Sequence, residues 1–349
     1  MPGKLTKNKV IISDQDEGNQ IYNKGYFGKP LSGGGLELDF YESLYLLETD
    51  RLNIVDVLGK DILKEDLMEY VLKNNNDDAL IEYPIYRDMR RRGYVIKQAG
   101  KPANFRVFPR GGGPGKTRSR YWVFTMGEND TFSVKEITEY CQRISKIKKD
   151  MVAGIMDEEG DVTYYKISTI DLKGRMRNDH EITFEGVLLG DKCLIKDGEE
   201  LHERYFFGNI IDDDLYLSLV EAYYLMEKYG IKIRKGLNKK YLNKNALKKV
   251  CTKRQDNFDI KYRLYSNLRD NGVIPKTGFK YGAAFRCYKG DPDKFHAEYI
   301  VQPVSNGYEI EWYHVSRAVR VAHSVKKEFV YGVVEDKDIV YIKIERITP

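Results

Sequence analysis

The chain has 349 residues, of which 42% are hydrophobic and 32% are charged, and its net charge is +5. This composition is typical of a soluble globular protein that is long enough for two or more domains. No apolar run approaches the roughly 20 residues that a bilayer span requires, which excludes a membrane protein. The opening MPGKLTKNKV lacks a signal core, so we expect an intracellular, cytoplasmic protein.

Two glycine-rich segments are expected to form turns. Residues 32–38 show the simple pattern of a turn, and residues 110–118 resemble a phosphate loop at first sight. Arg110, however, stands where the first glycine of that motif belongs, and an expected strand at 119–124 follows instead of a helix. A hairpin turn is therefore the favoured interpretation.

Further along the chain, the patterns predict both strands and helices. Apolar residues alternate over 161–170 and 338–347, as they do in half-buried strands. Helical spacing predicts helices over 218–230 and 262–272, the second one ended by Gly272. The sequence therefore predicts an α+β architecture.

Cysteines and charge give weaker indications. The four cysteines lie far apart without a CxxC pair, so neither a zinc site nor a disulfide framework is expected. The positive excess permits a polyanionic partner, and basic residues concentrate in 87–93 and 317–327. Such runs are more often solvated helix faces than nucleic-acid contacts.

The same motifs occur twice, about 180 residues apart. They follow the same order in both halves: 24–28 matches 204–208, 85–97 matches 264–276, 100–111 matches 278–290, and 146–167 matches 324–344. The chain is therefore predicted to be a tandem duplication of one unit, with a boundary near residue 172.

Reactive groups that occur in only one repeat are candidates for chemistry. The alignment places Tyr288 opposite Phe108 and His296 opposite Ser119, so the first repeat lacks both groups. A lone tyrosine or histidine is usually structural, but their joint loss in one repeat favours a role for both.

A third candidate is Lys327, which aligns with Lys149 and so could equally be shared scaffold. His314 and His323 are rivals to His296, whereas His180 and His202 have no suggestive neighbours.

These residue types suit metal-independent RNA cleavage. A base removes the proton of the 2′-hydroxyl, the oxyanion attacks the adjacent phosphorus, and an acid protonates the leaving 5′-oxygen. A cation stabilises the charge of the transition state. A metal-dependent nuclease is the alternative, but it needs clustered carboxylates, and the sequence offers no convincing cluster.

Residues 278–301 and 316–334 resemble the catalytic domain of the archaeal tRNA-splicing endonuclease family. The first carries GFKYGAAFRCYKGDPDKFHAEYIV and the second SRAVRVAHSVKKEFVYGVV. The resemblance covers essentially the whole chain and implies the homodimeric form of the family. It implies a degenerate structural repeat over 1–172 and a catalytic repeat over 173–349, each with a small N-terminal α/β subdomain. The nuclease-like subdomain of the catalytic repeat would span about 257–349.

The resemblance also assigns roles. Tyr288 would be the general base, His296 the general acid and Lys327 the cation, while Arg320 and Arg346 would sandwich a bulged base. The implied reaction is the excision of introns from precursor tRNA at bulge-helix-bulge sites, without metal or cofactor. It would leave 2′,3′-cyclic phosphate and 5′-hydroxyl ends. One departure is Ala284, where many relatives have an acidic residue.

An acidic turn in the first repeat completes the resemblance. Asp157, Glu158, Glu159 and Asp161 match the family loop that docks on a basic pocket of the partner's catalytic unit. A solvated turn between strands is the plainer interpretation. A non-catalytic RNA-binding or scaffold subunit is the alternative function, but such a subunit would be expected to lack the Tyr, His and Lys.

Overall fold

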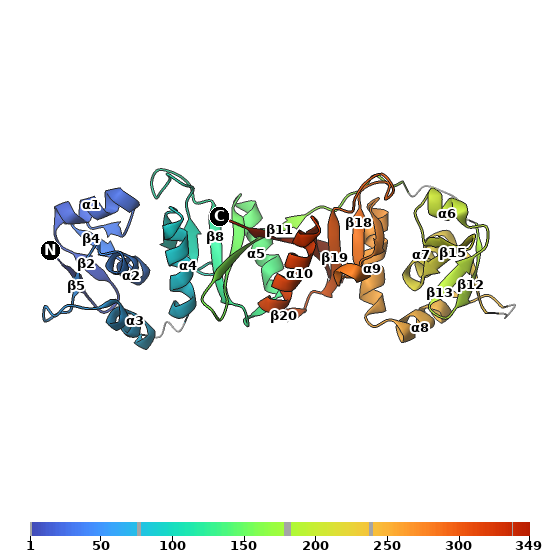
Figure 1. Cartoon of the computed structure of the whole chain (residues 1–349), viewed down its shortest axis with the longest axis horizontal. Helices are drawn as coiled ribbons and strands as arrows, with labels where there is room; N and C mark the ends of the chain where they lie inside the picture. Colours follow the sequence, from blue (N-terminus) through green and yellow to red (C-terminus); the bar gives the residue numbers. More distant parts are fainter. Residues whose placement is uncertain (1, 75–77, 178–182, 237–239, 337) are drawn as a thin grey trace.

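The computed structural model describes residues 2–74, 78–177, 183–236, 240–336 and 338–349. The molecule is elongated: the N-terminal subdomains of the two repeats lie at its two ends, and their C-terminal subdomains meet in the middle (Figure 1). Within the described ranges, no helix has the length and apolar character needed to cross a bilayer.

The first N-terminal subdomain is a five-stranded sheet in the order β3-β4-β2-β1-β5, covered by helices. Asp39 begins helix α2 by accepting a hydrogen bond from the Glu42 backbone N–H, which satisfies a donor that the helix itself cannot pair. The elements are β1 (Gly3–Leu5), β2 (Val10–Ile12), α1 (Gln15–Gly25), β3 (Lys29–Pro30), β4 (Leu36–Leu38), α2 (Phe40–Glu48), β5 (Ile54–Val55) and α3 (Lys64–Lys73).

The second N-terminal subdomain has the same sheet order, β14-β15-β13-β12-β16. Ser218 caps helix α7 as Asp39 caps α2, and Gly230 ends that helix in the left-handed conformation. The elements are β12 (Glu185–Leu189), β13 (Lys192–Ile195), α6 (Glu199–Glu203), β14 (Asn209–Ile211), β15 (Asp214–Ser218), α7 (Leu219–Tyr229), β16 (Lys232–Lys235) and α8 (Lys244–Arg254).

The two C-terminal subdomains share one ten-stranded sheet in the order β17-β18-β19-β21-β22-β11-β10-β8-β7-β6, and their strands β9 and β20 pair in a separate two-stranded sheet. The first contributes α4 (Ala79–Arg91), β6 (Ile96–Gln98), β7 (Phe105–Val107), β8 (Tyr121–Gly127), β9 (Thr131–Ser133), α5 (Val134–Lys146), β10 (Asp150–Met156) and β11 (Val162–Ile170). The second contributes α9 (Phe258–Asp270), β17 (Ile274–Thr277), the 3₁₀ turn η1 (Phe279–Tyr281), β18 (Phe285–Tyr288), β19 (Tyr299–Ser305), β20 (Glu309–Glu311), α10 (Trp312–Ser324), β21 (Glu328–Val334) and β22 (Ile339–Ile347).

An internal two-fold relation joins the repeats. Strands β11 and β22 run antiparallel, and Ile167 lies directly opposite Ile344, its own counterpart in the sequence alignment. Phe132 of β9 lies opposite Ile310 of β20, and these positions are also equivalent, because their separation of 178 residues (310 − 132) equals that of the first residues of α5 and α10 (312 − 134). When equivalent residues of two repeats lie opposite each other in antiparallel strands, a pseudo-two-fold axis must pass between the two residues of each pair.

Helices cover both faces of the ten-stranded sheet. Alternate residues of β10 pack on different sides: Val152 belongs to the core beneath α4, and Ala153 to the core that α5 and α10 share. Gly154 and Gly332 occupy matching positions where α4 and α9 approach the sheet. A Cβ atom at Gly332 would come within 2.5 Å of the Leu264 side chain, so this close packing needs glycine.

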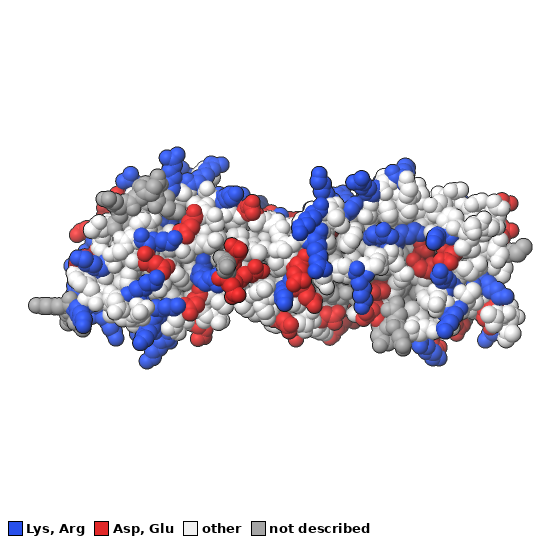
Figure 2. Space-filling model, turned by 180° about the vertical axis from the view of Figure 1, so that it is seen from behind, with Lys and Arg blue, Asp and Glu red and all other residues white. Residues whose placement is uncertain are grey.

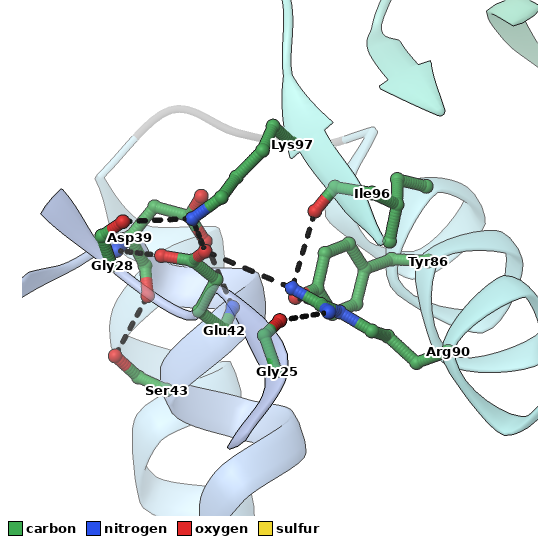
Figure 3. Close-up of polar contacts among 9 residues, drawn as sticks. All are labelled: Gly25, Gly28, Asp39, Glu42, Ser43, Tyr86, Arg90, Ile96 and Lys97. Atoms are coloured by element: carbon green, nitrogen blue, oxygen red, sulfur yellow. Dashed lines mark hydrogen bonds and ion pairs between the residues drawn. The ribbon is translucent and has the colours of Figure 1, made fainter. Parts of the chain in front are cut away.

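A buried polar network joins the two subdomains of the first repeat (Figure 3). Arg90 of α4 donates to the carbonyl of Gly25 at 2.8 Å and stacks 3.9 Å from the centroid of the Phe27 ring. Lys97 of β6 donates to the Gly28 carbonyl at 2.8 Å and to the Glu42 carboxylate at 2.5 Å. Because breaking a buried charge network leaves uncompensated charges, these contacts fix the two subdomains to each other.

The second repeat has the matching contacts to backbone carbonyls and to a phenylalanine ring. Arg269 donates to the Tyr205 carbonyl at 3.0 Å and stacks 3.9 Å from the Phe207 ring centroid, and Lys276 donates to the Gly208 carbonyl at 2.8 Å. The matching motifs at 24–28 and 204–208 therefore encode the joint between subdomains.

The structure confirms the duplicated α+β fold and the predicted helices and strands, but the turn expected over 32–38 covers only 32–35, because Leu36–Leu38 form β4. One member of the basic run at 87–93 departs from a solvated helix face, because Arg90 is buried. Arg91, which pairs with Glu48 at 2.9 Å, stays exposed, and Arg92 pairs with Asp88 at 2.6 Å.

Candidate active site

Tyr288 is the last residue of β18 and is only 7% exposed. It packs with Ile274 and Ala297, and Met176 from the segment that links the repeats lies against the same cluster. The linker is also held by its backbone, because the Arg175 N–H donates to the carbonyl of Lys289 at 2.8 Å. The tyrosine ring is therefore fixed by its own sheet and by the linker.

His296 is exposed on the loop between β18 and β19. Asp291 shapes this loop, because its carboxylate accepts from the Asp293 N–H at 2.9 Å and its carbonyl accepts from the Phe295 N–H at 3.0 Å. The next residue, Ala297, packs in the cluster around Tyr288. The imidazole thus stands in solvent beside a residue that contacts the tyrosine cluster.

Lys327 follows the turn that ends α10. Lys326 has a φ of +54° in the left-handed region, and the Lys327 N–H donates to the Ala322 carbonyl at 2.9 Å. The Lys327 ammonium lies 3.4 Å from the Val325 carbonyl oxygen and 5.9 Å from the centroid of the Tyr281 ring.

The three positions lie at one edge of the sheet. Strand β18 ends with Tyr288, β19 begins just after His296, and β21 begins just after Lys327. These strands are neighbours, and the Glu298 N–H donates to the Cys287 carbonyl while the Glu328 N–H donates to the Glu298 carbonyl. Because neighbouring strands are about 4.8 Å apart, the three predicted residues gather within a few strand spacings.

Two further residues, Arg286 and Tyr281, lie near these side chains and were not predicted from the sequence. The Arg286 guanidinium lies 5.7 Å from the Tyr288 ring centroid, and its Nε is buried without an acceptor among the described residues. Burial alone would raise the pKa of Tyr281, but its hydrogen bond to Lys280 and the charges of Lys280 and Lys327 hold that pKa below its usual value. The period-two spacing of Arg286 and Tyr288, which puts both on one face of the strand, could have indicated the first of these contacts.

The rival histidines lie elsewhere. His314 stacks against Tyr313 with the ring centroids 4.6 Å apart, and His202 Nδ1 lies 3.0 Å from the Phe207 carbonyl. His323 lines a pocket of about 570 Å³ together with Lys327 and Arg346. His180 lies outside the described residues.

The two predicted base-stacking arginines line different pockets of one chain. Arg346 shares its pocket with Lys327, whereas Arg320, exposed on α10, lines another of about 330 Å³ together with Asp157 of the first repeat. Arg346 lies opposite Tyr165, whose hydroxyl donates to Ser316 of α10 at 2.9 Å. Both arginines are therefore on the α10 side of the sheet.

The acidic turn of the first repeat is held by two of its own members. The Asp157 carboxylate accepts from the Glu159 and Asp161 N–H groups at 3.1 and 2.9 Å. The Glu158 carboxylate accepts from the Asn129 side chain at 3.2 Å. Glu159 and Asp161 use only their backbones in these contacts, and both are exposed.

Ala284, the departure from the family pattern, donates its N–H to the Gln302 side chain at 2.9 Å. Among the described residues, no three His, Cys, Asp or Glu side chains lie close enough together to hold a metal ion.

The fold and this edge define a class of protein: a duplicated pair of α+β domains in which only the second repeat combines Tyr, His and Lys at the sheet edge. The model for the tRNA intron endonuclease catalytic C-terminal domain matches residues 79–164 and 258–341. The model for the tRNA intron endonuclease N-terminal domain matches residues 1–68 and 184–246. The chain belongs to the tRNA intron endonuclease family.

Full-length archaeal relatives support this assignment. The tRNA-splicing endonuclease of Methanococcoides burtonii is 32% identical, over 99% of both chains. That of Methanosarcina barkeri is 32% identical over 97% of this chain and 98% of its own. That of Haloferax volcanii is 28% identical over the whole of both chains.

Proposed function

We propose that the chain is an endoribonuclease that excises introns from precursor tRNA. The observation that carries the proposal is the edge of the second repeat, where Tyr288, His296 and Lys327 lie at or just before the ends of the neighbouring strands β18, β19 and β21. The first repeat has Phe108 and Ser119 at the positions of the tyrosine and the histidine. Membership in the tRNA intron endonuclease family supports the choice of substrate.

In the proposed mechanism, Tyr288 takes the proton of the 2′-hydroxyl, and the 2′-oxygen then attacks the neighbouring phosphorus. Only the ionised phenolate of Tyr288 can take this proton, so its own proton must first pass to solvent, and the Arg286 guanidinium lies 5.7 Å from the centroid of the ring. The fixed position of the ring in its apolar cluster supplies the alignment that such a proton transfer requires.

His296 then protonates the leaving 5′-oxygen, and Lys327 stabilises the negative charge on the phosphorane-like transition state. The exposure of His296 suits an acid that must regain its proton from solvent after each turnover. The products would be a 2′,3′-cyclic phosphate and a 5′-hydroxyl, and neither step requires a metal ion.

We further propose that the substrate is a bulge-helix-bulge RNA whose unpaired base stacks on Arg320 and Arg346. Guanidinium planes are suitable surfaces for a splayed base. The rest of the surface gives less guidance, because Lys and Arg side chains alternate with Asp and Glu over the face seen in Figure 2. Local arrangement, more than net charge, would therefore select the RNA.

A homodimer would provide two catalytic edges, and the acidic turn would dock on the catalytic repeat of the other chain. A basic pocket of about 290 Å³ in the second repeat suits this role, because Lys192, Lys261 and Lys276 line it. Burial lowers the pKa of both Lys261 and Lys276, and the positive charge of Lys192 lowers the pKa of Lys261 further. A carboxylate that entered the pocket would therefore stabilise the charged form of both lysines.

The first repeat lacks one of the lysines of this pocket. Glu82 occupies the position of Lys261 (261 − 179 = 82), and it pairs with the Tyr41 hydroxyl and with Asn104. A docking site with positive charge is therefore specific to the second repeat. Glu159 and Asp161, which are exposed and use only their backbones in the contacts of the turn, are the side chains that would enter it.

The test is incubation of the purified chain with an intron-containing precursor tRNA in excess chelator, followed by analysis of the fragment ends. Cleavage in chelator that leaves 2′,3′-cyclic phosphate and 5′-hydroxyl ends is expected. Fragments with 5′-phosphate ends, or cleavage that stops in chelator, would overturn the mechanism. Binding without cleavage would instead favour a scaffold subunit.

A further inference from the structure

Two phenylalanines beside the candidate active site are exposed to solvent. Phe279 is 88% exposed and Phe295 is 53% exposed, and they are the two phenylalanines among the large hydrophobic side chains that are exposed in the described ranges. Burying an aromatic ring stabilises a fold, so a ring held out in solvent contributes little to folding and suggests a binding role.

Phe279 stands on an ordered hairpin tip between β17 and β18. The Phe279 N–H donates to Thr277 Oγ1 at 3.3 Å, and the Phe279 carbonyl accepts from the Gly282 N–H at 3.0 Å. The tip is closed by a bond of 3.1 Å from the Gly278 N–H to the Ala284 carbonyl. The ring is therefore presented by a loop whose backbone is fixed.

Phe295 stands at the other end of β18, directly before His296. Its N–H is bound by the Asp291 carbonyl, and its ring lies over Gly290, where a Cβ atom would come within 3.3 Å of the ring. The two rings thus flank the site along β18, whose four residues span roughly 10 Å.

Three cations lie near tyrosine rings of this hairpin. The Lys280 ammonium is 5.2 Å from the Tyr281 ring centroid, the Lys327 ammonium is 5.9 Å from the same centroid, and the Arg286 guanidinium is 5.7 Å from the Tyr288 ring centroid. Aromatic surfaces interleaved with positive charge are typical of proteins that bind single-stranded nucleic acid, because bases stack while the phosphates follow the cations.

The first repeat has no such rings. Its hairpin tip, residues 99–104, is AGKPAN, and the segment before Ser119, residues 109–118, is PRGGGPGKTR. The two exposed phenylalanines are therefore confined to the repeat that also has Tyr288 and His296, which ties them to the catalytic edge instead of the shared scaffold.

We propose that Phe279 and Phe295 are stacking surfaces for unpaired bases of the RNA on the two sides of the cleaved phosphate. This inference rests on the proposed function and adds a binding site to it. It also predicts a selectivity: unpaired nucleotides can reach the rings, whereas bases within a continuous duplex are already stacked and cannot.

The experiment measures equilibrium binding of two RNAs to the full-length chain, one with bulges and one fully paired. The bulged RNA has 2′-deoxy substitutions at the cleavage positions, so that it cannot be cut. Phe279→Ala and Phe295→Ala should each weaken binding of the bulged RNA by about 5- to 150-fold, the usual worth of one stacked base. Binding of the fully paired RNA should not change, and Phe279→Trp should restore affinity, with its fluorescence quenched by the bulged RNA.

Leu58→Ala is the matched control, because Leu58 is 90% exposed but lies in the first repeat. It should bind both RNAs like the parent chain. Equal affinity of the Phe→Ala variants and the parent for the bulged RNA would overturn the proposal. So would light scattering that shows the Phe→Ala variants losing a dimer that the parent forms, since the rings would then serve a second copy of the chain.

The two proposals can fail separately. A parent chain that neither binds the bulged RNA nor cuts the same RNA made without the 2′-deoxy substitutions would remove the proposed function itself. A parent chain that binds the first RNA and cuts the second, combined with unaffected Phe→Ala variants, would remove only the stacking surfaces.

Discussion

In the first repeat the Lys149 ammonium donates to the backbone carbonyl of Ser119, whereas in the second repeat the equivalent Lys327 lies near the Tyr281 ring and 3.4 Å from the Val325 carbonyl. The local backbone is the same, because Lys148 and Lys326 both have a φ of +54°. The same turn therefore presents a lysine in both repeats. The neighbouring residues decide whether its ammonium group is held by a short hydrogen bond within the protein.

The tyrosine position gives the same lesson. Phe108 and Tyr288 are each 7% exposed, so the first repeat keeps the ring and loses only the hydroxyl. The buried joints around Arg90 and Arg269 likewise share a hydrogen bond to a backbone carbonyl and a stacked phenylalanine ring. The two repeats therefore share their packed side chains, and they differ in the reactive groups at one edge of the sheet.

The largest effect should come from removing the proposed acid. His296→Ala should lower the cleavage rate by roughly 10²- to 10⁴-fold, the usual contribution of a positioned proton donor, with RNA affinity nearly unchanged. Single-turnover kinetics with a precursor tRNA would measure the rate, and equilibrium binding would measure the affinity.

His323→Ala is the matched control. His323 is also exposed and lines the pocket of Lys327, but it lies on α10 instead of the loop that packs beside Tyr288. It should slow cleavage far less than His296→Ala does. The reverse order of the two effects would move the role of acid to His323.

The two lysines allow a second comparison. Lys327→Ala should slow cleavage by about 10²- to 10³-fold, as the loss of one transition-state donor usually does. Lys149→Ala should leave cleavage unchanged and lower the Tm, because a hydrogen bond from a charged group contributes about 1.5–3 kcal/mol when well formed. Single-turnover rates and thermal unfolding would distinguish the two. A catalytic defect in Lys149→Ala would show that the first repeat is more than scaffold.

A charge swap tests the proposed docking. Lys261→Glu gives the second repeat the residue of the first, and it should reduce cleavage of a two-bulge substrate by about tenfold through repulsion of the acidic turn. Glu159→Lys with Asp161→Lys should do the same, and combining the two changes should restore much of the rate. Single-turnover cleavage and light scattering would follow all three variants. A Lys261→Glu chain that remains dimeric and cuts at the parental rate would leave the acidic turn as a solvated loop.

Much of this fold could be predicted from the sequence because the motifs that repeat are those that pack. The Arg90 and Lys97 positions and the glycine motif of 24–28 recur in the second repeat, where the same joint forms. Their role as a joint could not be predicted, since it depends on contacts between segments some 65 residues apart, such as Arg90 with Gly25.

The candidate site was predictable in part. The structure places Tyr288, His296 and Lys327 at one edge, although their roles stay predictions. The contact between Tyr281 and Lys327 could not be predicted, because it depends on the 3₁₀ turn η1 and does not follow the spacing of a helix or a strand. Lys261 escaped notice because its difference from Glu82 gains meaning only once the pocket around it is known.

The smallest effect concerns the joint between the two subdomains of each repeat. The repeats differ there, because the first has Asp39 at the position where the second has Ser218. Burial and the neighbouring Glu42 carboxylate raise the pKa of Asp39 to about 8, against the pull of Lys97 and Arg90. An acid whose pKa is raised by folding binds its proton more tightly in the folded state. Its contribution to stability is therefore present at low pH and is lost as the pH rises from about 4 towards 8.

Asp39→Asn keeps an oxygen that can accept from the Glu42 N–H but cannot ionise. Relative to this variant, the parent chain should lose roughly 1 kcal/mol of stability between pH 5 and pH 8, since each unit of pKa shift corresponds to about 1.4 kcal/mol and Asp39 is only partly buried. Calorimetric unfolding at several pH values would measure the difference. Ser218→Asn, the matched change in the second repeat, should show no such pH dependence. Parallel pH profiles for the parent and Asp39→Asn would mean that Lys97 and Arg90 hold Asp39 ionised throughout this range.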